Sequence, residues 1–275
     1  MPASWPAPGR DDDAGVTARP TSGDLRTRQV LVAALAALSG ATDAVGLLAL
    51  GGAFTSVMTG NLVLLGTAST TTNGALALSS GTAVLAFCLG VALGTLLAGT
   101  PRREDGVWPA RVTVALAVEG ALLVGYAAGW WVTGADRGAT AALLLLATTA
   151  VALGVQSSTV QRFGVPGLST TFLTGTLTGI VVRLTTRRPL REVLPGVQVV
   201  VGLVAGAAAG AAVVSALPGA APALQLALVA VVLVVASLRF HRGRAATSPG
   251  PHRETTADVQ EPGAPSGPPT PGGPR

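Results

Sequence analysis

Long runs of apolar residues, separated by short polar segments, dominate the middle of the chain. Six of these runs have the length of about 20 residues that a helix needs to cross a bilayer core of roughly 30 Å. They lie at about 29–50, 79–99, 112–133, 139–161, 193–217 and 222–240. The pattern predicts an all-α integral membrane protein with six transmembrane helices.

Two further segments, 54–68 (FTSVMTGNLVLLGTA) and 168–182 (LSTTFLTGTLTGIVV), are shorter and contain many Thr, Ser and Gly residues. We call them the T-G segments. Each could be a thin full span, or it could re-enter and leave the membrane on the same side. An arm of about eight helical residues reaches only about 12 Å, less than half of the bilayer core. Length alone leaves both arrangements open.

The arginines favour six spans with re-entrant T-G segments. If both termini are cytoplasmic, every arginine close to a span except Arg137 falls on the cytoplasmic side. If both T-G segments crossed fully, Arg102, Arg103, Arg111 and Arg162 would move outside. Because cytoplasmic loops carry an excess of Lys and Arg, we predict a multi-pass protein of the cell membrane with both termini in the cytoplasm.

The two ends of the chain differ from its centre. Residues 1–27 are rich in Pro, Asp, Gly, Ser and Thr, and residues 241–275 are richer still in Pro and Gly. Neither segment carries enough apolar surface to offset the entropy of ordering. We therefore predict disordered tails on both sides of a membrane domain at 28–240.

Composition excludes several functional classes. Only 11% of the residues are charged, against about 25% in soluble domains, so the lipid bilayer is the expected partner. The net charge of +5 comes from arginines between spans and does not indicate nucleic-acid binding. Cys88 is the only cysteine, and His241 and His252 follow the last span. Since a metal site or a Ser-His-Asp triad needs more than this, we expect no enzyme, catalytic residue, metal or cofactor.

The chain repeats itself. The stretch GATDAVGLLALGGAFTSVMTGNLVLLG resembles GVQSSTVQRFGVPGLSTTFLTGTLTGI, and both halves, 28–133 and 139–240, read span, T-G segment, span, span. With re-entrant T-G segments each half crosses three times and the two repeats are inverted, which is a common plan of transporters and channels. With full crossings the repeats are parallel. The alignment pairs two blocks: Thr59, Gly60 and Asn61 with Thr174, Gly175 and Thr176.

These motifs make the sequence similar to the YoaK-like family of bacterial multi-pass membrane proteins, which is built around a domain of unknown function. The resemblance rests on G-x-x-D-A, F-x-x-x-M-T-G-N and T-G-T, which begin at Gly40, Phe54 and Thr174. It covers about 28–240 and implies six spans. The family's second half usually reads G-x-Q-N-A, whereas here Gln156 is followed by two serines. Because the family has no established activity, the resemblance implies fold and location only.

Two carboxylates lie within predicted spans. Asp43 is midway along the first span, and Glu119 is about two turns into the third. An ionisable residue inside a membrane is costly and usually marks a substrate pathway or a proton relay. Asp43 could instead be a protonated structural residue bonded to neighbouring Thr hydroxyls. Glu119 could share a proton with Asp43, contact an arginine, or be hydrated near the interface.

The T-G blocks also have two interpretations. Their Gly and Thr residues could line a polar cavity at the repeat interface, or they could simply allow close helix packing. The first favours a transporter or channel for a small solute, and the alternative is a non-transporting scaffold or sensor partner. Formation of an oligomer remains open. The candidate pathway residues are Asp43, Thr59, Gly60, Asn61, Glu119, Gln156, Thr174, Gly175 and Thr176.

Overall fold

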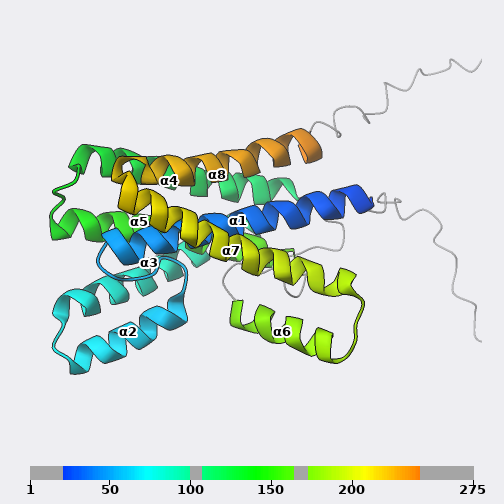
Figure 1. Ribbon diagram of the computed structural model, residues 1–275. Helices are drawn as coiled ribbons and strands as arrows, with labels where there is room; N and C mark the ends of the chain where they lie inside the picture. Colours follow the sequence, from blue (N-terminus) through cyan, green and yellow to red (C-terminus); the bar gives the residue numbers. More distant parts are fainter. Residues whose placement is uncertain (1–20, 100–106, 164–172, 242–275) are drawn as a thin grey trace, which may run out of the picture.

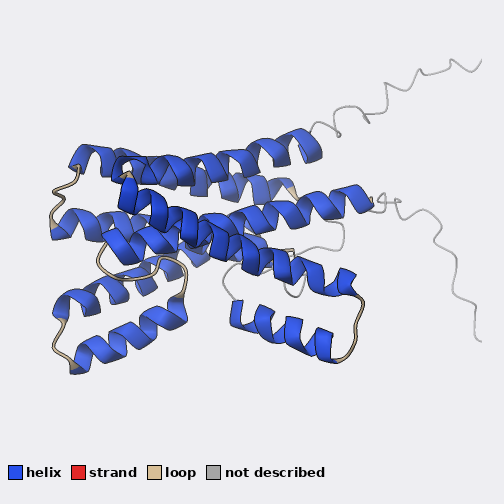
Figure 2. Cartoon of the chain, in the orientation of Figure 1, coloured by secondary structure: helices blue, strands red, loops and turns tan. Residues whose placement is uncertain are grey.

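The computed structural model describes residues 21–99, 107–163 and 173–241, and these residues fold into helices joined by short connections (Figures 1 and 2). Six helices are long and apolar enough to cross a membrane, which confirms the prediction of six candidate spans. They are α1 (Ser22–Ala49), α3 (Gly74–Ala98), α4 (Ala110–Thr133), α5 (Ala139–Gln161), α7 (Leu190–Ala216) and α8 (Ala221–Ala236). A short 3-10 helix, η1 (Pro218–Ala220), precedes α8, and a short π-helix, η2 (Ser237–His241), follows it.

The first helix begins earlier than its apolar run. α1 starts at Ser22, inside the segment that the sequence predicts as an N-terminal tail. The Thr21 hydroxyl accepts a hydrogen bond of 3.2 Å from the Asp24 backbone N–H, and Asp24 lies in the first turn. An N-cap and an early acidic residue stabilise helix starts, so polar residues extend α1 beyond the hydrophobic span.

Each predicted T-G segment contributes a short helix. These are α2 (Met58–Thr70) and α6 (Leu173–Thr185), with 13 residues each. A helix of that length is about 20 Å long, too short to cross a bilayer core of roughly 30 Å. α2 packs on α3 and α6 packs on α7. Figure 1 shows both on the same side of the bundle, with their first residues toward each other and their last residues toward opposite ends.

Glycines allow α1 and α7 to pack with their backbones in contact. A Cβ atom on Gly206 of α7 would overlap the carbonyl group of Ala37 in α1, and a Cβ on Gly40 of α1 would overlap the carbonyl oxygen of Leu203. Such close approach is typical of membrane helices with small residues at four-residue spacing.

α3 and α5 pack in the same way. A Cβ on Gly90 of α3 would overlap the carbonyl group of Val151 in α5, and a Cβ on Gly154 of α5 would overlap the carbonyl oxygen of Phe87. The bundle therefore contains two close helix crossings, α1 with α7 and α3 with α5.

α4 and α8 complete the bundle. α4 packs on α5 and α8, and α8 also packs on α1. At the end of α4, the indole N–H groups of Trp130 and Trp131 donate hydrogen bonds of 3.0 and 2.8 Å to the carbonyls of Pro218 and Gly219. These bonds join the end of α4 to the start of the last span.

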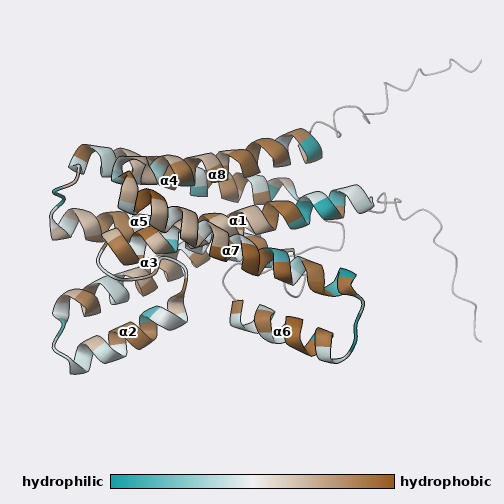
Figure 3. Cartoon of the chain, viewed as in Figure 1, coloured by the Kyte–Doolittle hydropathy of each residue, from teal (hydrophilic) through white to brown (hydrophobic). Residues whose placement is uncertain are grey.

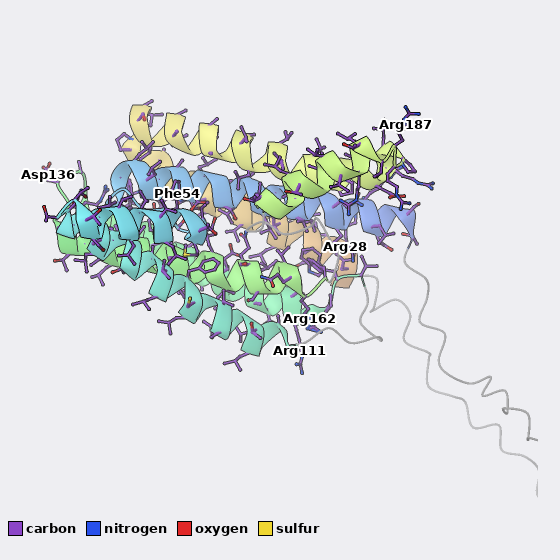
Figure 4. All side chains as sticks on the ribbon, turned by 90° about the horizontal axis from the view of Figure 1, so that it is seen from below. Arg28, Phe54, Arg111, Asp136, Arg162 and Arg187 are labelled. Carbon is purple, nitrogen blue, oxygen red and sulfur yellow. The ribbon has the colours of Figure 1, made fainter. Side chains whose placement is uncertain are left out.

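Charged residues lie toward the two ends of the bundle. Figure 3 shows mostly hydrophobic colours along the spans, with hydrophilic colours gathered toward helix ends and connections. Arg28, Arg111, Arg162 and Arg187 lie at one end in Figure 4, and Asp136 lies at the other. Which end faces the cytoplasm stays a prediction from the arginine distribution.

Candidate functional site

Asp43 is buried on α1 and fully hydrogen-bonded. Its Oδ1 atom accepts bonds from the backbone N–H groups of Thr55 and Ser56, both at 2.7 Å, and from the Thr55 hydroxyl at 2.9 Å. Its Oδ2 atom accepts a bond of 2.6 Å from the Ser56 hydroxyl. Because four donors meet the carboxylate, its burial is compensated. Asp43 thus holds the segment before α2 against α1.

Asn61 holds the same segment from the other side. Its Oδ1 atom accepts a bond of 2.9 Å from the Phe54 backbone N–H, and its Nδ2 atom donates one of 2.6 Å to the Phe54 carbonyl. Gly60 lies against the Phe54 ring, since a Cβ there would be 3.2 Å from it. Thr59 is exposed. We define Asp43, Asn61 and the segment 54–57 as the α2 clamp.

The second T-G block is placed differently. Thr174 and Gly175 are exposed on α6, whereas Thr176 is buried. Thr176 faces α7, where a Cβ on Gly196 would lie 3.3 Å from its methyl group. Figures 1 and 4 both show α2 and α6 apart, so the structure does not join the two T-G blocks in one contact.

Gln156 links α5 to α1 in the interior. Its Nε2 atom donates to the Leu35 carbonyl at 3.1 Å and to the Ser39 hydroxyl at 2.7 Å. Gln156 and Ser39 are both buried. The predicted pathway residue therefore bridges the first span of each half.

Glu119 on α4 differs from Asp43, Asn61 and Gln156, whose side chains form the hydrogen bonds described above. Its side chain is 0% exposed, and neither carboxyl oxygen has a hydrogen-bond partner in the described part of the chain. The carboxylate of Asp43 is bonded to Thr55 and Ser56 instead. The structure therefore does not pair the two carboxylates.

Sequence reasoning missed two buried polar residues further along the α4–α8 contact. Tyr126, two turns after Glu119 on α4, lies next to Gln225 of α8. Both side chains are buried, and each is a polar neighbour of the other. Toward the α4–α5 connection, the centres of the Tyr126 and Trp130 rings are 5.8 Å apart. The Arg137 guanidinium lies over the Trp130 ring, 3.6 Å from its centre. Polar groups thus follow α4 from the Arg137 end to Glu119.

Comparison with known proteins identifies the family of the chain but not an activity. The UPF0700 transmembrane protein YoaK of Bacillus subtilis (strain 168) is 35% identical over 150 residues, which cover 54% of this chain and 64% of that protein. The match thus spans 64% of the length of this curated relative. No solved structure matches the chain. The sequence profile of the family described as "Protein of unknown function (DUF1275)" matches residues 31–237, and the chain therefore belongs to the DUF1275 family.

Proposed function

We propose that this membrane protein is a transporter or channel for a small solute, built from inverted repeats of residues 28–133 and 139–240. The observation that carries the proposal is that equivalent positions of the two halves form the two close helix crossings, α1 with α7 and α5 with α3. Ala37 and Val151 stand three residues before Gly40 and Gly154, the two positions that open the aligned stretches. Inverted repeats that cross around a central site are a recurring design of membrane transporters.

The agreement extends to the partner glycines. Ala37 meets Gly206, and its repeat equivalent Val151 meets Gly90. Ala41 meets Gly210, and its equivalent Val155 meets Gly94. A pseudo-two-fold relation between the halves accounts for this correspondence, because it exchanges the α1–α7 crossing with the α3–α5 crossing.

The short helices support the inverted arrangement. α2 and α6 occupy the same place in their halves and run toward opposite ends of the bundle (Figure 1). In inverted halves, the two short helices would point to opposite ends of the bundle. In parallel halves, both would point to the same end of the bundle. Their length of 13 residues also favours re-entrant arms over full spans.

A pathway through the interior is favoured over one through the α2 clamp. The polar groups of the clamp bond to one another, which is what a structural connection requires. The interior between α4 and α8 instead contains Glu119, whose carboxyl oxygens have no hydrogen-bond partner in the described residues. Such groups cost free energy in a static bundle. The scaffold alternative offers no gain that offsets this cost.

Thiol labelling tests the inverted arrangement. We design two variants in a Cys88→Ala background, Ala110→Cys and Asp136→Cys. Both positions are exposed; Ala110 is the first residue of α4, and Asp136 follows the last. In intact cells an impermeant reagent should label the cysteine at 136 and spare the one at 110. Labelling at position 110 from outside would contradict the six-span arrangement and, with it, the inverted repeat.

Transport itself is tested in a deletion strain. Growth on an array of metabolites should reveal a solute to which the deletion strain and the same strain complemented with the protein respond differently. Accumulation of that labelled solute in membrane vesicles should then depend on the protein. Equal growth and equal accumulation for every solute class would reject the transport proposal in favour of the scaffold.

A further inference from the structure

α4 and α8 bury the same pattern of positions, which aligns the third span of each half. The spacing is identical along both helices, although α4 buries further positions as well. The matched residues are Ala115, Leu116, Glu119, Leu123, Tyr126 and Trp130 on α4, and Ala221, Pro222, Gln225, Val229, Val232 and Ala236 on α8. This register makes Gln225 the counterpart of Glu119.

Contacts between the two helices agree with this register. Gly120 of α4 faces Leu233 and Val229 of α8, and Tyr126 lies next to Gln225. Residue numbers rise along one helix as they fall along the other, so the helices are antiparallel, as inversion requires. Glu119 and Gln225 therefore lie on either side of the centre of the α4–α8 contact.

Within the described residues, no charged side chain of a neighbouring helix bonds to Glu119. The sequences of α5 and α8 contain no Asp, Glu, Lys, Arg, His, Cys or Tyr residue. α3 offers only Cys88, which is exposed. On α4 itself, Arg111 and Tyr126 are each about two turns away. On α1, Asp43 is bonded to the segment before α2, Arg28 lies over the Phe163 ring, and Asp24 and Arg26 lie in the first two turns.

An ionised carboxylate at this position would be buried without a counter-charge or a donor, which is among the most costly arrangements in a membrane protein. A protonated carboxylic acid has no net charge and nearly the shape of a glutamine side chain. The equivalent position of the second half does hold glutamine. The surroundings thus suit the neutral form of Glu119.

We propose that Glu119 is the proton-binding residue of this protein, and that the two halves form one protonatable position and one permanently neutral position, Gln225. The carboxylate takes a proton from water when the pathway opens to one side. The carboxylic acid returns that proton to water when the pathway opens to the other side. This inference deepens the proposed function, because a solute that moves with the proton requires a transporter. Proton binding itself can be measured without any solute.

Infrared spectroscopy of the full-length protein in phospholipid vesicles at neutral pH tests the proposal. The wild type should show the carbonyl band of a buried protonated carboxylic acid, and Glu119→Gln should lack it. Asp136→Asn, at an exposed position of the α4–α5 connection, is the matched control and should leave the band in place. An unchanged band in Glu119→Gln would overturn the proposal.

The reciprocal variant keeps the test decisive if Glu119→Gln accumulates poorly. Gln225→Glu places a second carboxyl in the equivalent surroundings and should add intensity to the same band. No added intensity would contradict the equivalence of the two positions. Absence of the band from the wild type would reject the proton site but leave the transport proposal standing. Absence of uptake in the wild type, with the band present, would reject transport instead.

Discussion

Two buried carboxyl groups in this membrane domain have opposite surroundings. Asp43 accepts four hydrogen bonds from Thr55 and Ser56, whereas Glu119 has no partner in the described residues. The first arrangement compensates burial and fixes a chain segment. The second leaves an uncompensated group that is tolerated best where a proton can occupy it. Position within a predicted span therefore does not distinguish these two carboxyl groups, whereas their hydrogen bonding does.

Removal of the Asp43 carboxylate should have the largest effect on stability. Asp43→Ala leaves two backbone N–H groups and two hydroxyls buried, and each unsatisfied group costs about 1–3 kcal/mol, so we expect at least about 3 kcal/mol less free energy of unfolding. Thermal unfolding of the purified protein measures this loss. Thr59→Ala, on the exposed face of α2, is the control. Equal unfolding of Asp43→Ala and wild type would mean that the clamp does not stabilise the fold.

A Cβ at either close crossing should have the next largest effect. Gly206→Ala and Gly90→Ala each force two backbones apart, and overpacking of this kind costs about 1–3 kcal/mol. If the halves are equivalent, the two variants should be destabilised to a similar extent. Gly175→Ala, where nothing lies within 4 Å of an added Cβ, controls for the change itself. A large effect at one crossing and none at the other would argue against the pseudo-two-fold relation.

The sequence was sufficient to predict the six long helices, but it was not sufficient to predict the contacts between their side chains. Length and hydropathy decide whether a helix crosses a membrane, and the six predicted runs are the six long helices. Asp43 and Glu119 stood out because charge is rare in such runs. Their opposite surroundings depend on tertiary packing: nothing local in the sequence shows that Thr55 and Ser56 turn back onto Asp43.

Gln225 shows a second limit. A single Gln in an apolar run has no distinctive local pattern, and it became informative only when the buried positions of α4 and α8 could be compared. Tyr126 became informative in the same way, through its position beside Gln225. Burial supplies a helix register that hydropathy alone does not.

Deletion of the buried Tyr126 hydroxyl should have a smaller effect on stability. Tyr126→Phe removes the polar neighbour of Gln225, and a hydrogen bond between neutral side chains contributes about 0.5–1.5 kcal/mol to the free energy of unfolding. Asp43→Ala, for which we expect a larger loss, is the reference in the same unfolding measurement. A loss in Tyr126→Phe as large as that in Asp43→Ala would contradict this ranking.

Glu119→Gln should have the smallest effect on folding and the most specific effect on function. The change preserves volume, and it replaces a neutral carboxylic acid by a neutral amide, so no buried charge is created. Gln225 indicates that such a side chain fits the equivalent surroundings. The variant should therefore accumulate in the membrane and unfold near the wild-type temperature. Because glutamine cannot carry the proton, uptake of the solute found in the deletion screen should lose its response to an imposed pH gradient. Exchange of labelled for unlabelled solute, which needs no net proton movement, should persist. An unaltered pH response in Glu119→Gln would assign proton coupling elsewhere, and a simultaneous loss of uptake and exchange would mean that Glu119 contributes to solute binding rather than to coupling.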